Sequence, residues 1–534
     1  MKNIVLAGFL FSVACGPAAD LAPQDTDPPV DPSAAAVAAE PDTQRSASVT
    51  ATATAAATVL QPLLGTDCGT VVPLKDGAYE LSDVSQLQAI DTSGCSYFSG
   101  DVRVAFTVPL VPSSQRYLFE LKNVVAVSSA ITQYRTTQTV RFAGLQSAGR
   151  IEVRAGGTCV YPALKTASAL TLQQDCLFPA LESVSSLTLD GVAAVTGFPK
   201  LQRAGSVSVS GSGALDIKGF KALAQVDQLA LKVPTSKITG SFPALQTVEQ
   251  LSISDADLTG FSLPKLTAVT RSLSQVRCRE LSRPFKVLQT AGHWAVTASA
   301  SSQKLAGPAT LITLGSLDVD LGTNRLELSG FSGLKTVSGG IAARGSGNLR
   351  VSGFGELTSL GAMLIVASTL GMEGFNKLAE IGGPLTIRTL QDSVYTDDRF
   401  TAFRALTDIM GAVELSLDDP ESAAFPLLKS VGGDLSFREL ERPARAANVF
   451  PLLETVAGSL TVENQAASFA ALKRVDKTLK ILDVPGSLSG KRIDGFRKLT
   501  VVGGDLVIDK NAELRDAQRI LDRLVGFAGT VRLE

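Results

Sequence analysis

The sequence predicts an all-β fold, a parallel β-solenoid, and three observations lead to this class. A large apolar residue, usually Phe, recurs along most of the chain at steps of mostly 19 to 25 residues. Apolar residues follow it three and six positions later, and then an apolar-x-apolar pair, as in Phe178-Leu181-Val184-Leu187-Leu189. Glycine is frequent, at 47 residues, as expected for short buried strands separated by tight corners. Repeats of this size cannot bury their own apolar faces, so neighbouring turns must stack.

Each copy of the pattern begins at an anchor, which is the large apolar residue that opens it. A weaker copy begins at Leu118, before the clear ones. The copy at Phe285 places Trp294, the only Trp, at a strand position, which predicts a structural role for this side chain. The clear anchors are Phe142, Tyr161, Phe178, Phe220, Phe242, Leu263, Phe285, Pro308, Phe331, Phe354, Phe375, Phe403, Phe425, Phe450, Phe469 and Phe496.

Within each copy the apolar-x-apolar pair predicts a short strand, and the three-residue spacing before it predicts a corner with inward-pointing side chains. The strand pair lies nine and eleven residues after the anchor in most early copies, and ten and twelve after it in most copies from Phe375 on. The added residue often lies beside a Gly pair such as Gly432-Gly433, which suits a bulge or a tight corner. We therefore expect two halves of slightly different cross-section, residues 59–330 and residues 331–534.

The C-terminal end carries a predicted cover. About seventeen turns stacked at roughly 4.8 Å would give a rod of roughly 80 Å, and the ends of such a rod must be protected. Asn511 can cap a helix that starts at Ala512, and a last strand follows from Thr530 to Leu533. The apolar side of this helix comprises Leu514, Ala517, Ile520, Leu521 and Leu524.

Five cysteines follow the N-terminal segment. Cys159 and Cys176 each lie two residues before an anchor, so stacking should bring their Cα atoms to roughly 4.8 Å, inside the range of a disulfide. Cys68 and Cys95 flank the first apolar pattern, and we expect them to staple an N-terminal cap. Cys278 then has no partner and is predicted to be a buried free thiol.

The first residues predict export. The apolar run Ile4 to Val13 is too short to span a bilayer as a helix, so residues 1–14 are interpreted as a cleaved signal. Ser12-Val13-Ala14-Cys15 resembles the lipobox of bacterial lipoproteins, although Ser12 stands where those proteins prefer an aliphatic residue. The resemblance implies that Cys15 becomes the lipidated first residue. Gly16, rather than Asp, follows Cys15, and this resembles Gram-negative lipoproteins that are sorted to the outer membrane.

An ordinary secretory signal is the alternative, with cleavage after Ala18 or Ala19. In either case, residues 15–58 alternate Pro with Asp and then continue as an Ala/Thr/Ser run, a composition with few side chains to bury. We expect a disordered tether that holds a folded body away from a membrane surface.

The repeats resemble the receptor L-domain and its leucine-rich-repeat-like bacterial relatives. The likeness lies in the unit Phe425-Pro426-Leu427-Leu428-Lys429-Ser430-Val431-Gly432-Gly433-Asp434-Leu435-Ser436-Phe437 and in the ending Val502-Gly503-Gly504-Asp505-Leu506-Val507-Ile508. It covers about residue 140 to the end, and most turns lack the Asn ladder of ordinary leucine-rich repeats. The resemblance implies a right-handed solenoid that binds an extracellular partner and implies no chemistry.

Little in the chain indicates catalysis or a cofactor. The formal net charge is −2, which predicts no strong attraction of the whole chain to nucleic acid. The one histidine, His293, cannot form a His-based metal site, and no zinc, phosphate-loop or serine-hydrolase motif occurs. The acidic pairs Asp397-Asp398 and Asp418-Asp419 are interpreted as solvated turn residues. We therefore predict no enzyme activity, no metal and no cofactor.

Three long segments between a strand and the next anchor, after Ile387, Phe437 and Ile481, suggest a binding surface. They share one position within the turn and occur in every second turn, so they should leave the same edge of the rod. Three solvated loops without a ligand are the alternative. The candidate ligand-binding residues are Arg388, Tyr395, Arg399, Arg438, Arg442, Arg445, Lys491 and Arg492.

The sequence thus favours a lipid-anchored, non-enzymatic surface protein that recognises or adheres to an extracellular protein or glycan. Its only predicted membrane contact is the N-terminal lipid. A carbohydrate-active solenoid enzyme is the competing class, because solenoid polysaccharide lyases exist. A purely structural role in the cell envelope is the third possibility.

Overall fold

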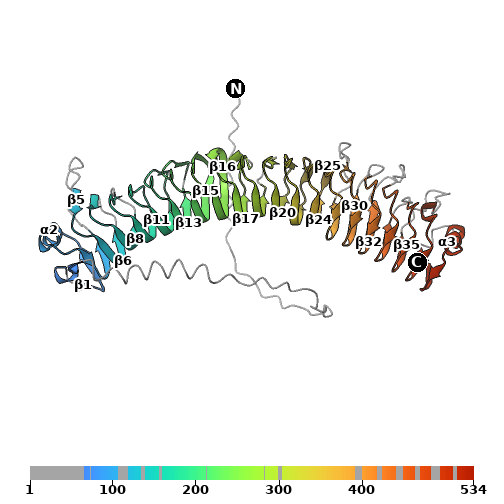
Figure 1. The fold of residues 1–534 in the computed structure, drawn as a ribbon, viewed down its shortest axis with the longest axis horizontal. Coiled ribbons are helices and arrows are strands. Elements are labelled where there is room, and N and C mark those ends of the chain that lie inside the picture. The colour runs from blue at the N-terminus through green and yellow to red at the C-terminus, as the bar shows by residue number, and fades with distance from the viewer. Residues whose placement is uncertain are drawn as a thin grey trace, which may run out of the picture. The chain divides into compact units, whose positions relative to one another are not determined.

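The chain folds as a parallel β-solenoid of about 17 turns, which confirms the predicted fold class. The computed structural model describes residues 65–72, 74–105, 118–133, 139–154, 159–211, 213–281, 283–298, 303–390, 400–417, 424–439, 449–463, 469–482, 494–508 and 514–533. The predicted signal, Cys15 and the tether lie outside these ranges. One sheet of 32 strands, here called the main sheet, runs through the whole stack, and its strands follow one another in chain order (Figure 1).

Each turn from the N-terminal side to the middle contributes one continuous strand to the main sheet. These strands begin five residues after an anchor and are longer than the predicted apolar-x-apolar pairs. They are β6 (Ala126–Gln133), β8 (Ser147–Val153), β10 (Thr166–Leu172), β11 (Ser183–Leu189), β13 (Arg203–Ser210), β15 (Gln225–Ser241), β16 (Thr247–Ser262), β17 (Ala268–Val276), β18 (Thr290–Thr297), β20 (Thr313–Gly322), β22 (Thr336–Gly345) and β24 (Ser359–Ala367).

After β24 the main-sheet strand of each turn is split in two. The pairs are β26 (Glu380–Ile381) and β27 (Leu385–Thr389), β29 (Asp408–Ile409) and β30 (Val413–Leu417), β31 (Ser430–Val431) and β32 (Leu435–Glu439), β33 (Thr455–Val456) and β34 (Leu460–Glu463), β35 (Arg474–Val475) and β36 (Leu479–Leu482), β37 (Val501–Val502) and β38 (Leu506–Ile508), and β39 (Gly526–Phe527) and β40 (Val531–Leu533).

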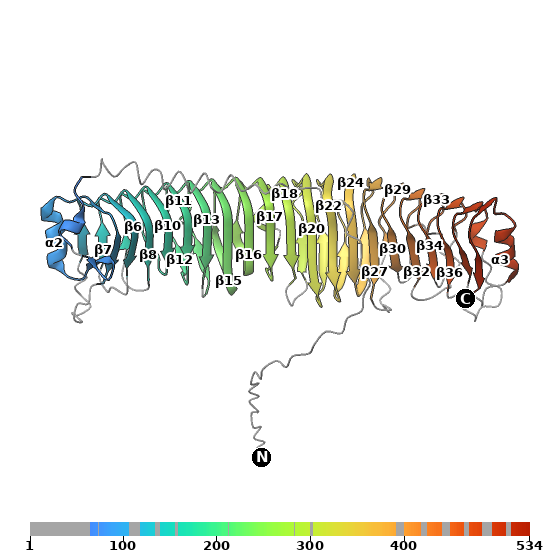
Figure 2. The ribbon, with the colours of Figure 1, turned by 90° about the horizontal axis from the view of Figure 1, so that it is seen from below.

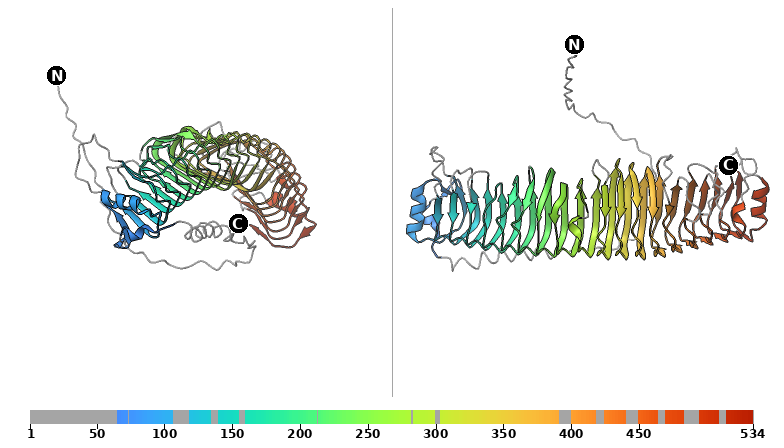
Figure 3. Two further views of the ribbon diagram at one scale, coloured as in Figure 1. Left: turned by 60° about the vertical axis from the view of Figure 1, so that its left-hand side comes forward. Right: turned by 90° about the horizontal axis from the view of Figure 1, so that it is seen from above.

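The split coincides with the extra residue that the sequence predicts for these turns, although β17 and β22 also contain an added residue and stay continuous. Leu360 pairs with Ile381, but Met363 pairs with Leu385, so one residue is added between β26 and β27. The next turns keep this spacing, since Ile381 pairs with Ile409 and Leu385 with Val413. The main sheet itself continues without a break through this change (Figure 3).

The corner pattern places its apolar side chains in the core. Phe178, Leu181 and Leu187 are fully buried, and Leu187 pairs in register with Leu170 on one side and Val207 on the other. The anchors stack ring on ring from Phe142 to Phe242, with centroids 5.0 to 5.5 Å apart. A second aromatic stack extends from Phe331 to Phe496. Stacked rings are favourable beyond the area that they bury.

Three turns depart from the predicted assignment of anchors. Phe198 opens a turn of its own, and its ring stacks between those of Phe178 and Phe220. The list of anchors predicted from the sequence omits Phe198. The turn assigned to Leu118 is anchored by Leu121, because Leu121 pairs with Phe142. A last copy begins at Leu521, whose spacing to Leu524 and Phe527 repeats the corner pattern.

Trp294 interrupts the aromatic stacks and has the predicted structural role. Its indole lies fully buried between Phe285 and Phe331, with edge-on contacts to both rings. A buried indole N–H needs an acceptor, and Trp294 Nε1 donates to Gln275 Oε1 at 3.1 Å. Gln275 in turn donates through Nε2 to the carbonyl of Leu281 at 2.8 Å. The buried amide therefore has partners at both ends.

The other side of the turn is formed by shorter strands (Figure 2). They form a sheet of three and a sheet of five strands, while β12 pairs with β14 and β14 pairs with the long strand β15. Two short 3-10 helices, η3 (Arg283–Phe285) and η4 (Asp494–Phe496), lead into anchors. The short strands are β5 (Leu118–Leu121), β7 (Thr139–Phe142), β9 (Cys159–Val160), β12 (Ala194–Val195), β14 (Leu215–Ile217), β19 (Gln303–Ala306), β21 (Leu326–Ser329), β23 (Asn348–Val351), β25 (Thr369–Glu373) and β28 (Phe400–Thr401).

A helix lies at each end of the stack (Figure 2). The C-terminal helix α3 (Leu514–Leu521) confirms the predicted cover, with Ile520 buried against the core and strand β40 after it. The proposed cap Asn511 lies outside the described residues. The N-terminal cap comprises η2 (Cys68–Thr70), β1 (Leu74–Lys75), β2 (Ala78–Leu81), α2 (Val84–Ser93), β3 (Tyr97–Phe98) and β4 (Asp101–Val104).

The sequence interpretation does not include helix α2. A signal for it is present, because Asp83 and Gln86 form a capping box, in which each side chain accepts from the backbone of the other residue. Leu87 and Ile90 of this helix are buried in the core.

Candidate functional site

Both predicted disulfides are formed. Cys159 and Cys176 join successive turns with their Cα atoms 4.9 Å apart, close to the expected stacking distance. Cys68 and Cys95, with Cα atoms 5.1 Å apart, tie the start of the N-terminal cap to the second residue after helix α2. Cys278 is buried and is in neither disulfide, as predicted, and burial raises the pKa of its thiol to about 11.

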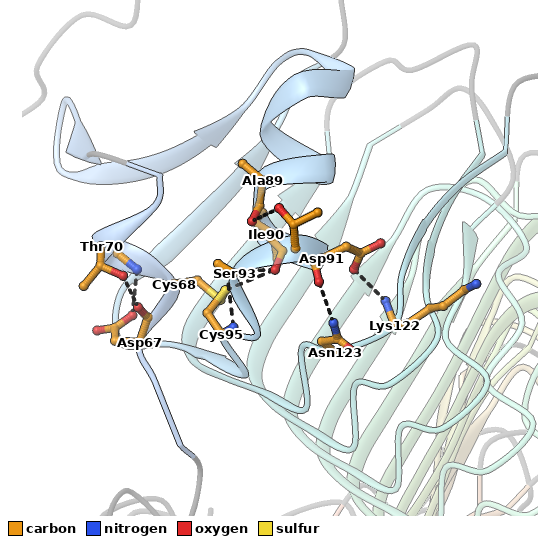
Figure 4. The surroundings of a disulfide bond; sticks show 12 residues. Asp67, Cys68, Thr70, Ala89, Ile90, Asp91, Ser93, Cys95, Lys122 and Asn123 are labelled. Atoms are coloured by element: carbon orange, nitrogen blue, oxygen red, sulfur yellow. Dashed lines mark hydrogen bonds between the residues drawn. A yellow bond between two sulfur atoms is a disulfide. The ribbon is translucent and has the colours of Figure 1, made fainter.

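The disulfide of the N-terminal cap lies in a network of local hydrogen bonds (Figure 4). Ser93 Oγ donates to the carbonyl of Ile90 at 2.9 Å and accepts from the backbone of Cys95 at 3.2 Å. Asn123 Nδ2 donates to the carbonyl of Asp91 at 3.0 Å, which joins helix α2 to the following turn. The segment from Cys68 to Cys95, closed by the disulfide, therefore covers the first turn.

The described part of the chain contains two of the eight predicted binding residues. Arg388 follows the buried Ile387 on β27 and forms an ion pair with Glu414 of the next turn. Arg438 follows the buried Phe437 on β32, and its Nε lies 3.6 Å from Glu463 Oε2 of the next turn. Both side chains are about half exposed. Each therefore takes part in a cross-turn ion pair and remains open to solvent.

The other six predicted residues lie outside the described ranges: Tyr395, Arg399, Arg442, Arg445, Lys491 and Arg492. The strands that precede their segments are described. β27, β32 and β36 stack through β30 and β34, so these strands end at one edge of the main sheet in every second turn. This arrangement agrees with the predicted spacing of the three segments.

His293 lies on the outer face of the main sheet. Its Nδ1 is 2.7 Å from Ser316 Oγ and 3.4 Å from Asp318 Oδ2, both on the next strand β20. No group of three or more His, Cys, Asp or Glu side chains that could hold a metal ion occurs among the described residues. The contacts of His293 are those of a surface residue that links two turns.

The predicted acidic pairs Asp397-Asp398 and Asp418-Asp419 lie outside the described residues, but the fold forms another carboxylate pair. Asp227 on β15 and Glu249 on β16 occupy equivalent positions in adjacent turns. Burial and the neighbouring Glu249 raise the pKa of Asp227. In the described part of the chain, neither carboxylate forms an ion pair with a Lys or Arg. The pair therefore lacks the cation that a polysaccharide-cleaving site would add.

We predict that Asp227→Asn raises the melting temperature at pH 7. The raised pKa means that the folded state binds a proton more tightly than the unfolded state, so ionised Asp227 destabilises the fold above its folded pKa. The gain should shrink as the pH falls through that pKa and vanish below the unfolded value of about 3.9. Thermal unfolding of the natural protein and of Asp227→Asn at several pH values measures this gain in melting temperature. Glu249→Gln should give a smaller gain, and a loss of stability in Asp227→Asn at pH 7 would contradict the prediction.

Three glycines at equivalent positions of the main-sheet strands have a steric explanation. A Cβ atom at Gly149 would lie 2.4 Å from the carbonyl oxygen of Ser129 in the preceding turn. The corresponding distance is 2.4 Å from Gly292 to the oxygen of Arg271, and 2.0 Å from Gly361 to that of Gly339. Successive turns approach each other too closely here for a side chain. These three glycines lie within β8, β18 and β24, so the corner role that the sequence indicates for glycine is wrong for them.

In the described ranges no helix is both long enough and apolar enough to cross a membrane. A comparison of the chain with protein-family models and with curated proteins finds no match. The resemblance to the receptor L-domain therefore stays a prediction.

Proposed function

We propose that this protein is an exported, non-enzymatic surface protein that presents a rigid solenoid for the recognition of an extracellular glycan or protein. The observation that carries the proposal is the contrast between the two parts of each turn. The corner and strand positions are apolar and fully buried in turn after turn, whereas the segments between the strands vary in length and sequence. A constant core with variable loops is typical of binding scaffolds.

The two disulfides support export. Disulfides persist in oxidising compartments and are rare in the cytosol of most organisms. The proposal includes cleavage of residues 1–14, a lipid on Cys15, and residues 15–58 as a tether at the outer membrane of a Gram-negative bacterium. Labelling with a radioactive fatty acid, compared between the natural chain and Cys15→Ala, tests the lipid anchor.

Two observations favour binding over catalysis. The Asp227 and Glu249 pair has no cationic partner among the described residues, and Arg388 and Arg438, on strands β27 and β32, face carboxylates of the next turn. A structural envelope protein is the other candidate, because ion pairs between turns also strengthen a rod. Binding and cleavage assays on the same glycans separate these functions.

We predict that Arg442→Ala, Arg445→Ala and Arg492→Ala together weaken binding by about tenfold or more, equivalent to about 1.4 kcal/mol. Arginine side chains supply planar donors for carboxylates and sugar hydroxyls. The measurement is glycan-array and whole-cell binding of the mature protein. Unchanged binding with an unchanged melting temperature would exclude this edge as the site. Absence of binding in the natural protein would favour the structural role.

A further inference from the structure

We propose that a linear acidic polysaccharide binds along a second edge of the solenoid, the edge formed by the corners that precede the main-sheet strands. The edge at which β27, β32 and β36 end is here called the loop edge. It and the corner edge lie at opposite ends of the main-sheet strands, because these strands run parallel. The inference deepens the proposed recognition function by naming a partner class. It does not depend on the loop residues.

Lysines line this edge in the middle of the stack. Within a corner, the anchor and the third residue after it point into the core, while the first, second and fourth residues after the anchor lie outside. In the seven turns anchored from Phe198 to Phe331, these three outer positions hold five Lys and no Asp or Glu. The five, here called the lysine ridge, are Lys200, Lys221, Lys265, Lys286 and Lys335, and all are exposed.

The ridge extends along the stack. Six turn-to-turn steps separate its first and last members, a length of roughly 29 Å at about 4.8 Å per turn. Lys377 and Arg404 continue the same positions beyond it, and the first carboxylate to appear there, Glu356, forms an ion pair with Lys377 at 2.7 Å. The chain as a whole carries a net charge of −2, so this concentration of positive charge is local.

At other positions of the described turns, charged side chains form ion pairs with opposite charges on neighbouring turns. On the opposite side of the turn, Lys304 lies 2.6 Å from Glu327, and Arg350 lies 3.2 Å from Glu373, each pair joining different turns. At the loop edge, Arg388 and Arg438 also pair with carboxylates of the next turn. None of the five ridge lysines forms an ion pair with any described residue. A stacked row of like charges is unfavourable by itself, so an external anion is the missing counterpart.

Uncharged side chains between the lysines favour a sugar polymer. Gln202, Gln246 and Gln289 occupy the fourth position after their anchors and are exposed. Their side-chain amides make no hydrogen bond to a described residue, so both the donor and the acceptor are available for hydroxyl groups. A single file of five cations in seven turns fits one thin chain of carboxylate or sulfate groups better than a broad surface.

Other polyanions fit the edge less well. Single-stranded nucleic acids are usually bound by exposed aromatic rings, and the large apolar side chains that are exposed in the described ranges are all aliphatic. Membrane contact uses an apolar face beside the basic one, and along these seven turns Ile312 is the only such exposed side chain described. Nucleic acid and lipid surfaces are therefore outcomes to be tested.

The test measures binding of the mature protein to alginate and to dextran sulfate at increasing salt, with neutral dextran as the control polymer. The ridge variant is Lys221→Gln, Lys265→Gln and Lys286→Gln. The matched variant is Lys232→Gln, Lys237→Gln and Lys480→Gln, which removes the same charge from exposed lysines outside the ridge. We expect the ridge variant to bind about tenfold more weakly and to lose two to three units of the salt dependence, since each released counterion contributes roughly 0.7–0.9.

The natural protein, the matched variant and the loop variant of Arg442, Arg445 and Arg492 should all bind the acidic polymers equally. Equal loss in both lysine variants would overturn the ridge, because net charge alone would then explain binding. Absence of binding in the natural protein at low salt would overturn it too. Stronger binding to duplex DNA, or to vesicles of equal parts phosphatidylglycerol and phosphatidylcholine, would overturn the assignment to a polysaccharide. Loss of binding in the loop variant alone would instead support the loop edge.

Discussion

Phe220→Ala should lower the free energy of unfolding by about 3–5 kcal/mol. The Phe220 ring is fully buried and lies between two others, 5.4 Å from Phe198 and 5.1 Å from Phe242, with the planes close to parallel. Truncation removes the buried area, leaves a cavity and breaks two ring stacks at once. Because each turn is supported only by its neighbours, the damage should spread to the adjacent turns rather than be absorbed by one large core.

Denaturant unfolding followed by circular dichroism measures this change. Phe220→Leu keeps most of the volume and loses the stacking, so it should destabilise the protein by about 1–3 kcal/mol, the sum of two aromatic contacts. Leu427→Ala is the matched control, because Leu427 is also in a corner but is 42% exposed, and its effect should be small. A surface-like effect of Phe220→Ala would mean that the assigned register of the turns is wrong.

The buried half of each turn can be predicted from the sequence because its apolar residues follow each anchor at a fixed spacing. Spacing alone places Phe178, Leu181 and Leu187 inward, and equivalent spacing before an anchor predicts the Cys159 to Cys176 disulfide. The turn at Phe198 obeys the same rule and was predictable. Helix α2 was harder to predict, since a capping box of Asp83 and Gln86 is a short signal in a region without repeats.

The outer surface is less predictable because its chemistry depends on which residues the stacking brings together. The ion pair between Arg388 and Glu414 joins residues on different turns, at different positions within the turn. The two residues come together only because adjacent turns stack, so neither residue alone indicates the ion pair. The lysine ridge has the same origin. Its members stand at the first, second or fourth position of a corner, and only the full set of anchors shows that they share one edge.

Gly240→Ala should be among the most damaging conservative substitutions in the chain. Gly240 has a φ of +96°, a conformation that residues with a Cβ rarely adopt, and a Cβ there would lie 1.9 Å from the carbonyl oxygen of Ile217. That oxygen belongs to the adjacent turn, where Ile217 pairs with Gly240, so it cannot move without breaking the sheet. Backbone strain of about 1–3 kcal/mol and overpacking of about 1–3 kcal/mol should add to a loss of about 2–6 kcal/mol.

Two further glycines separate these contributions in the same unfolding experiment. Gly191 has a φ of +70° but open space around its Cβ position, so Gly191→Ala should show backbone strain alone. Gly355 has neither a positive φ nor a neighbour within 4 Å, so Gly355→Ala should be neutral or slightly stabilising, because alanine restricts the unfolded chain. If Gly240→Ala were no worse than Gly191→Ala, the turns could separate at this corner. The rigid stacking that the proposed binding edges require would then be absent there.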